Sequence, residues 1–318
     1  VLKQGTNLLW IAQDQGLAKY NLTTGQVEII RYPKNAENYQ EFRELRALAL
    51  DEHGNLWIGT YKNGVYIYNT THKTFTHLDE NNGLSHPEVL KIMRDNDNNM
   101  WVGTGNGANL WLPDKQRFRV YKMDEADEQT LLGSIVQDIY QAKNGAIWIA
   151  TQKGLNLYQP NSQTFKHYSV LNGLATSLIR AVVDDQNGNL WLTTNKGIST
   201  LNPNTNEVVN YDGSEGILGA NYYANSLVVA ANNTLFTSSQ RGVEYFNTDL
   251  EENDVKSPNV VLTGFSKMGE QIKLEQPYSY VKEIDLSYQD YFISFEFSVL
   301  DFTAPSKNQY AYRLEGYD

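Results

Sequence analysis

The chain has 318 residues, and its 26 lysines and arginines against 37 aspartates and glutamates give a net charge of −11. So acidic a chain is a poor partner for the phosphate backbone of nucleic acids, and we find no basic cluster that would hold it on an anionic membrane surface. Cysteine is absent, which excludes disulfides, thiolate metal sites and cysteine nucleophiles. Hydrophobic residues make up 41%, enough to bury a core, so global disorder is excluded.

The sequence carries no segment that would place it within a membrane. A membrane-spanning helix needs about 20 consecutive apolar residues, and no run approaches this length. The chain opens in the middle of a repeat at Val1, without an initiator methionine or a signal peptide, so we expect an excised piece of a longer protein. Aromatic residues reach 12%, with 21 tyrosines, which favours an all-β structure.

Aromatic residues recur at near-equal spacing along most of the chain. Trp10, Trp57, Trp101, Trp148, Trp191 and Phe236 follow one another at steps of 47, 44, 47, 43 and 45 residues. A similar phrase surrounds each of them, and its fullest copy is DEHGNLWIGT from Asp51 to Thr60. A glycine follows six or seven residues after each aromatic residue, at positions 16, 64, 107, 154, 197 and 242. An internal repeat with this period is stronger evidence for a fold class than any single motif.

Each unit contains short apolar runs separated by turn residues. In the second unit these runs are 45–50, the tryptophan phrase, 66–69 and 74–78. Glycine and asparagine tolerate the positive φ that tight hairpin turns demand. Four strands every 40 to 50 residues or so are the period of a β-propeller blade. We therefore predict an all-β fold with a β-propeller of four-stranded blades in about six units.

These residues also resemble a known family. The phrase Gly-Asn-Leu-Trp-Ile-Gly-Thr, followed by Gly-Val or Gly-Leu and then Tyr-Asn, is similar to the two-component regulator propeller repeat, over roughly residues 1–250. The runs 257–265 and 291–297, and the closing stretch 300–318, resemble the triple-tyrosine β-sandwich that follows such propellers. The resemblance implies the sensor region of a bacterial membrane receptor.

The predicted domains are a propeller over 1–250, a linker over 251–257 and part of an immunoglobulin-like sandwich over 258–318. We expect both ends of the propeller to be incomplete. The first unit lacks its own first strand and the last shows three strands, so the ring is expected to be an open arc or to close irregularly. The sandwich is also expected to be cut, because such domains need about 100 residues.

Motifs for catalysis and metal binding are weak throughout. The five histidines, at positions 53, 72, 77, 86 and 167, are expected in exposed turns and strands. Asp95–Asn99 resembles the start of a calcium loop, but the sixth and twelfth positions are Met100 and Asn106 instead of glycine and glutamate. The carboxylate pairs 184–185 and 251–252 point to opposite faces of an extended chain. We therefore predict no catalytic residue, no metal and no cofactor.

The repeated tryptophans are expected to be inter-blade core residues and not sugar-stacking platforms, because one per blade stands at one offset. Trp111 breaks the offset and is expected to be packed as well. Polar residues of the first strands are better candidates for a ligand site, since first strands line the channel of a propeller. We count eleven or ten residues back from the repeated aromatic residues and add the tyrosine pair that follows the irregular stretch 213–219. The resulting candidates are Arg46, Lys91, Gln137, Arg180, Tyr222, Tyr223 and Asn225. Asp138 is the one carboxylate at these offsets.

Guanidinium and amide groups suit carboxylates and sugar hydroxyls. The resemblance implies a periplasmic, non-catalytic sensor fragment that binds a small molecule or an oligosaccharide. It also implies that the sandwich passes the signal to a transmembrane helix and a cytoplasmic histidine kinase or diguanylate cyclase, within a homodimer. The membrane would be reached only through segments absent here. Two alternatives stay open: a protein-interaction scaffold, which an exposed apolar patch would favour, and a propeller-fold enzyme acting on sugars.

Overall fold

We describe the protein from a computed structural model, which covers residues 1–14, 16–32, 42, 44–219, 221–249, 259–274, 276–281, 283–299 and 310–313. The chain divides into two compact units, Val1–Thr248 and Asp249–Asp318. The linker 251–257 and the motif after residue 299 lie almost entirely outside the described residues, so the predicted domain boundaries stay predictions. Within the described ranges, no helix has both the length and the apolar character of a membrane span.

The first unit is a series of antiparallel sheets in which strands follow chain order. The first three sheets are made of β1 (Leu2–Gln4), β2 (Leu8–Gln13), β3 (Gly16–Asn21) and β4 (Val27–Ile30); β5 (Leu45–Leu50), β6 (Leu56–Thr60), β7 (Val65–Asn69) and β8 (Thr74–Leu78); and β9 (Val89–Arg94), β10 (Met100–Thr104), β11 (Gly107–Leu112) and β12 (Arg117–Tyr121).

The series continues with two further sheets of four strands and one of three. They are β13 (Val136–Gln141), β14 (Ile147–Thr151), β15 (Leu155–Gln159) and β16 (Thr164–Tyr168); β17 (Ile179–Asp184), β18 (Leu190–Thr194), β19 (Ile198–Leu201) and β20 (Val208–Tyr211); and β21 (Val228–Val229), β22 (Thr234–Ser239) and β23 (Gly242–Asn247). Short 3-10 helices lie between strands, at η2 (Glu80–Asn82), η3 (Pro113–Lys115), η4 (Val170–Asn172) and η5 (Gly213–Glu215).

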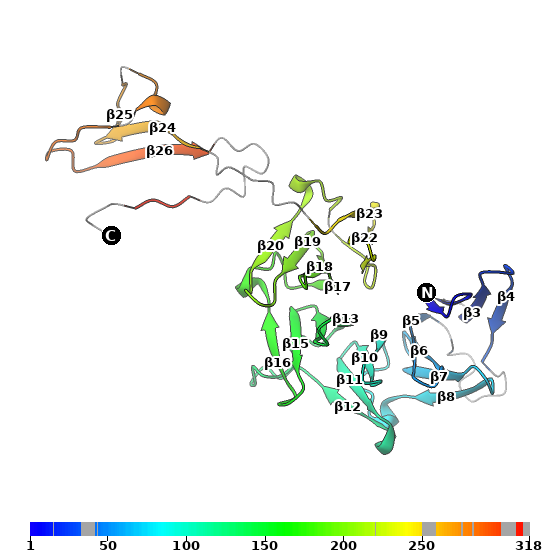
Figure 1. The fold of residues 1–318 in the computed structure, drawn as a ribbon. Coiled ribbons are helices and arrows are strands. Elements are labelled where there is room, and N and C mark those ends of the chain that lie inside the picture. Colours follow the sequence, from blue (N-terminus) through cyan, green and yellow to red (C-terminus); the bar gives the residue numbers. More distant parts are fainter. Residues whose placement is uncertain are drawn as a thin grey trace. The chain divides into compact units, whose positions relative to one another are not determined.

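The sheets are arranged as the blades of a propeller. Consecutive first strands contact each other, from β5 to β9, β13 and β17. Figure 1 shows these strands toward a common centre and the fourth strands β8, β12, β16 and β20 on the outside. The predicted fold class is confirmed. One detail was wrong: the first unit does have a first strand, because Leu2–Gln4 pairs with β2 after a short turn.

The repeated tryptophans join each blade to the next. Trp10 packs on Tyr68 with ring centroids 6.1 Å apart, Trp101 on Tyr158 at 5.1 Å, and Trp191 on Phe246 at 5.5 Å. Trp57 packs in the same way on Trp111, at 6.0 Å. The tryptophans are buried, and Trp111 is packed as well. Their predicted role in the inter-blade core is therefore confirmed.

Glycines next to these tryptophans allow the blades to approach closely. A Cβ atom added to Gly59 would lie 2.4 Å from Val89 Cγ1 of the next blade, and one added to Gly103 would lie 2.6 Å from Val136 Cγ1. Neighbouring first strands can therefore approach this closely only where the residue two positions after the tryptophan is small. This explains why the first four blades carry alanine or glycine two residues after the tryptophan, at positions 12, 59, 103 and 150, whereas the fifth has Thr193 there.

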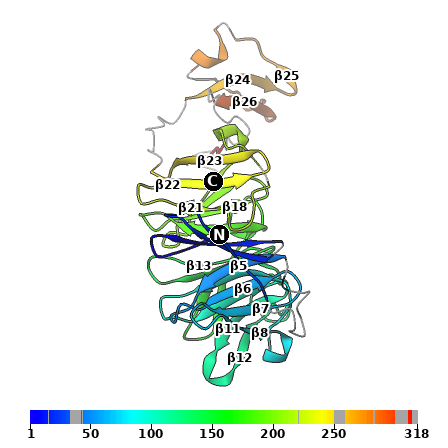
Figure 2. The ribbon, with the colours of Figure 1, turned by 90° about the vertical axis from the view of Figure 1, so that its right-hand side faces the viewer.

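The last blade presents an apolar face that no described residue covers. Phe236 occupies the tryptophan position of this blade, but it is 39% exposed, and its ring stacks on that of Tyr245, which is 72% exposed. Figure 2 shows β21, β22 and β23 side by side. In the first blade, Val27 of the fourth strand is 60% exposed, whereas Phe118 at the equivalent position of the third blade is buried. The described blades thus form an open arc, one of the two expected outcomes.

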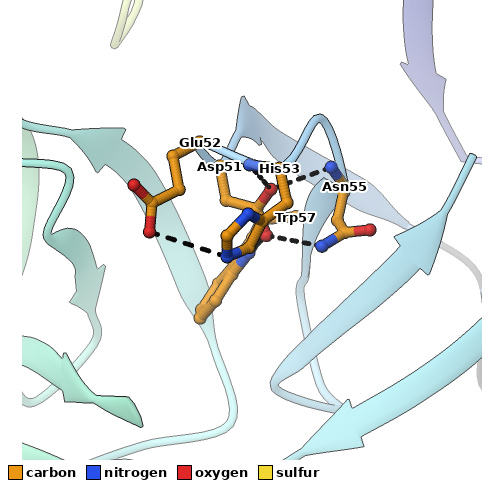
Figure 3. Close-up of polar contacts among 5 residues, drawn as sticks. All are labelled: Asp51, Glu52, His53, Asn55 and Trp57. Carbon is orange, nitrogen blue, oxygen red and sulfur yellow. Dashed lines mark hydrogen bonds and ion pairs between the residues drawn. The ribbon is translucent and has the colours of Figure 1, made fainter.

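Aspartates cap the turn in front of several tryptophans. In the second blade Asp51 accepts hydrogen bonds from the backbone N–H groups of His53 and Asn55, from Asn55 Nδ2, and from Trp57 Nε1 at 3.2 Å (Figure 3). Asp95 and Asp185 do the same for Trp101 and Trp191, at 2.9 and 3.0 Å. In the first blade Gln4 takes this place, with a bond of 2.7 Å from Trp10.

The second unit contains one three-stranded sheet in its described part. β24 (Val260–Lys267) pairs with β25 (Glu270–Gln271) on one side and with β26 (Ile293–Val299) on the other, and η6 (Tyr278–Tyr280) follows β25 in the chain. The two longer strands correspond to the runs predicted from alternating apolar residues. Their pairing is antiparallel, with Phe265 opposite Phe295. The assignment of this unit to an immunoglobulin-like sandwich stays a prediction.

Candidate functional site

Four consecutive first strands carry an irregularity at the same place. In β5 the pairing with β6 joins Leu45 to Thr60 and then Ala47 to Gly59, so Arg46 is skipped. The skipped residues in the next three blades are Leu90, Gln137 and Arg180. A β-bulge of this kind bends the strand and redirects its side chain. The residues eleven positions before these tryptophans therefore lie at β-bulges, a feature that counting along the sequence does not reveal.

Lys91 lies at the centre of the polar contacts in the channel. Its ammonium group lies 2.7 Å from Asp138 Oδ1 of the next blade, and it donates a hydrogen bond of 3.0 Å to Asn225 Oδ1, in the segment that leads into the sixth blade. Asp138 Oδ2 accepts a bond of 3.0 Å from the backbone N–H of Val182. The Asp138 side chain is 4% exposed and that of Lys91 is 26% exposed. These contacts connect the third, fourth, fifth and sixth blades.

The two arginines of the predicted site differ in their surroundings. Arg180 Nη1 donates a bond of 3.1 Å to Gln137 Oε1, and its Nε is buried without a hydrogen-bond partner. Arg46 places its guanidinium 4.3 Å from the centre of the Tyr61 ring. Among the described residues neither arginine forms an ion pair. Both therefore keep donor groups that an anion or a hydroxyl-rich ligand can use.

The tyrosine pair does not form the expected aromatic wall. Tyr222 is buried, and its hydroxyl donates a bond of 2.5 Å to Glu244 Oε2. Burial, and then this hydrogen bond, raise the pKa of Tyr222 well above the ordinary value of a tyrosine. Only Tyr223 presents its ring to solvent. The side chain of Tyr222 thus holds the segment before β21 onto the last blade and is not available to a ligand.

The structure brings the predicted residues together in two groups. Lys91 lies with Asn225, and Gln137 lies with Arg180, while Arg46 pairs with an aromatic ring outside the predicted set. Asp138 belongs to the first group but was not among the predicted ligand-binding residues. Its position one residue after Gln137, at the offset of Lys91, was the signal for it. Whether these residues bind a ligand stays a prediction.

The other candidate motifs have structural roles. Asp95 accepts hydrogen bonds from the backbone N–H groups of Asp97 and Asn99, as expected for a turn. Asp184 accepts bonds from Tyr140 Oη at 2.6 Å and from the N–H of Lys143 at 2.7 Å, so it joins two blades. Glu251 and Glu252 lie outside the described residues. Among the described residues no three histidine or acidic side chains gather as metal ligands would.

The ion pair in the channel gives a first testable expectation. Asp138→Asn leaves the partly buried Lys91 without its counter-charge, and we expect the free energy of unfolding to fall by about 1–3 kcal/mol. Lys91→Met alone should also destabilise, and the double variant should be more stable than the sum of the two effects predicts. Urea unfolding at constant m-value measures all three. Strict additivity of the two substitutions would contradict the coupling.

Three comparisons place the chain among known proteins. The two component regulator propeller family matches residues 42–62, 83–106 and 130–153, in the second, third and fourth blades. Histidine kinase P4 of Formosa agariphila is 27% identical over 330 residues, which cover 99% of this chain and 24% of that protein. The chain thus spans about a quarter of the length of this curated relative.

Solved structures share the fold. The extracellular domain of a protein described as a hybrid two component system, from B. thetaiotaomicron, matches with a TM-score of 0.61 and 23% identity, over 96% of this chain and 47% of that one. The extracellular domain of a one component system from the same organism has a TM-score of 0.63 and 19% identity, over 84% and 33%. An enzyme is similar too: virginiamycin B lyase from Staphylococcus aureus has a TM-score of 0.56 and 15% identity, over 79% and 84%.

Proposed function

The chain carries repeats of the two-component regulator propeller family, and from this premise we propose that it is a ligand-sensing fragment of a bacterial transmembrane receptor. The fragment lies in the periplasm, binds a small molecule or a glycan fragment in the propeller channel, and has no catalytic role. The matched histidine kinase and the two extracellular domains with the same fold support this reading.

One observation carries the proposal: two bulged first strands present guanidinium groups that no described carboxylate neutralises. The Nε of Arg180 is buried without a hydrogen-bond partner, which carries a desolvation cost unless a ligand uses this donor, whereas the exposed Arg46 is open to a ligand. Arg180 is held by Gln137, so its direction is set before a ligand arrives, and Arg46 is held by the Tyr61 ring. Such preorganised donors lower the entropic cost of binding.

The path of the signal is part of the proposal. Asn225, which bonds to Lys91, lies in the segment that Tyr222 and Glu244 fix to the last blade. Glu244 belongs to β23, the last strand before the second unit begins at Asp249. A ligand that binds one arrangement of these contacts better than another shifts the population toward it. In the whole receptor, a homodimer, the sandwich would pass this shift to the cytoplasmic output.

A thermal-shift screen tests the proposal. The full chain, and the longer receptor region that contains it, are heated with cellobiose, digalacturonate, citrate and glutamate in turn. Because a ligand of the native state raises the unfolding midpoint by mass action, a saturable increase with one class supports the sensor reading. Conversion of that compound to a product would instead make the fragment an enzyme. An unchanged midpoint with every compound would contradict small-molecule sensing.

The scaffold alternative has one observation in its favour. The uncovered face of the last blade carries Phe236, Val243 and Tyr245, and exposed apolar patches mark protein interaction sites. The enzyme alternative has less support. Asp138, the carboxylate among the channel candidates, is engaged by Lys91 and by the backbone of Val182, so it is not free to transfer a proton to a substrate.

A further inference from the structure

A pocket of about 500 Å³ lies at the other end of the first strands. Its walls come from β1, β5, β9 and β13, at positions late in each strand, such as Leu50, Arg94 and Gln141. The bulges lie early in the same strands. Four residues separate Arg46 from Leu50, which corresponds to about 13 Å along a strand. Neither Arg46 nor Arg180 lines this pocket, and Lys91 is the one predicted ligand-binding residue that does, so the arginines of the proposed sensor site lie outside it.

The charged side chains on the wall of this pocket are all cationic. They are Lys3, Lys91 and Arg94, and no aspartate or glutamate among the described residues lines it. Lys91 already pairs with Asp138, whereas Lys3 and Arg94 are exposed and form no ion pair with any described residue. The carboxylates that contact the lining from behind are also engaged, Asp138 by Lys91 and Asp184 by Tyr140. The pocket therefore offers positive charge without a local counter-charge.

The rest of the wall is mainly apolar. Leu2, Leu48, Leu50 and Met93 are half-buried and supply apolar surface, and Asn96 and Gln141 supply amides. Gln141 already accepts a bond of 2.7 Å from the N–H of Asn96, so this polar part of the rim is held in place. Known ligand sites have volumes of roughly 300–1,000 Å³, with apolar walls and a few polar groups that fix orientation. The pocket has this composition.

We propose that this pocket binds a small organic carboxylate with a compact apolar body, such as an aromatic acid. The apolar body lies on Leu48, Leu50 and Met93, and the carboxylate is held by Arg94 and Lys3. A guanidinium binds a carboxylate with two parallel N–H···O bonds, and an ammonium adds a point charge. A neutral sugar would leave the apolar wall unused, and a cation would be repelled by Lys3 and Arg94.

The test uses naphthalene-2-carboxylate as the probe, with titration calorimetry on the full chain. The matched neutral compound is 2-naphthalenemethanol, which keeps the apolar body and loses the charge. We expect the acid to bind at least 10-fold more tightly than the alcohol, and its affinity to fall when salt is raised from low to high concentration. Equal affinity of acid and alcohol, or no binding of the acid, would overturn the proposal.

Charge-neutralising variants locate the site. Lys3→Gln and Arg94→Gln should each weaken binding of the acid about 5-fold or more, whereas Lys115→Gln, an equal charge change in η3, should leave it unchanged. All three side chains are exposed, so the urea midpoint should stay within a few tenths molar of the parent value. If both pocket variants retain full affinity, the site is wrongly assigned. The double variant Arg46→Ala/Arg180→Ala should bind the acid normally, which separates this pocket from the proposed sensor site.

Discussion

Trp101→Ala is expected to lower the free energy of unfolding of the propeller by about 3–5 kcal/mol. The Trp101 side chain is buried between two blades, where its ring contacts Tyr121 at 5.8 Å and Tyr158 at 5.1 Å. Removing it leaves a cavity that the two sheets cannot close, because their first strands already touch. Urea unfolding followed by tryptophan fluorescence and by circular dichroism measures the loss.

Phe236→Ala is the matched control, because it truncates the aromatic residue at the same repeat position. Phe236 is 39% exposed, so we expect a loss of about 1 kcal/mol or less. The difference between the two variants measures what a following blade contributes to this position. Equal losses would contradict the assignment of the repeated aromatics to inter-blade packing.

Asp95→Ala is expected to cost about 2–4 kcal/mol, the second largest effect. The Asp95 carboxylate accepts bonds from the N–H groups of Asp97 and Asn99, from the Asn99 amide and from Trp101 Nε1. Both Asp95 and Trp101 are buried. Alanine leaves the indole N–H without an acceptor, and a buried donor without a partner carries its full desolvation penalty.

A double-mutant cycle with Trp101→Phe separates the two roles of Asp95. Phenylalanine keeps most of the packing but removes the indole donor, so part of the Asp95 effect should disappear in that background. The residual effect belongs to the turn. If Asp95→Ala costs the same in both backgrounds, the bond to Trp101 contributes nothing to stability.

The fold could be predicted from the sequence because each repeat carries the residues that pack one blade against the next. One aromatic residue, one small residue and one turn glycine at nearly constant offsets specify both the blade and its packing against the next blade. The first strand of the first blade was missed, since Leu2–Gln4 has only three residues and lacks the apolar alternation of the others. Its register depends on pairing with β2 and on the bond from Trp10 to Gln4, which no local pattern shows.

The candidate site could be predicted only in part. Offset counting found Lys91, Gln137, Arg180 and Asn225, because position in a blade decides which residues face the channel. Which of these residues pair depends on contacts between blades far apart in the chain, such as Lys91 with Asn225.

The turn in front of Trp148 in the fourth blade also depends on a contact between blades that the sequence does not reveal. It carries Ala142 where the second, third and fifth blades have the capping aspartate, and Asp184 of the next blade holds that turn instead through the N–H of Lys143.

The most direct test of the sensor account compares the parent chain with Arg46→Ala/Arg180→Ala in the presence of digalacturonate and citrate. The account predicts that a saturable increase in the unfolding midpoint of the parent is lost in the double variant, while the midpoint without added compound stays similar. Lys115→Gln, which changes a charge away from the channel, should keep the full increase. An unchanged increase in the double variant would show that the bulged arginines do not form the ligand site and would contradict the account.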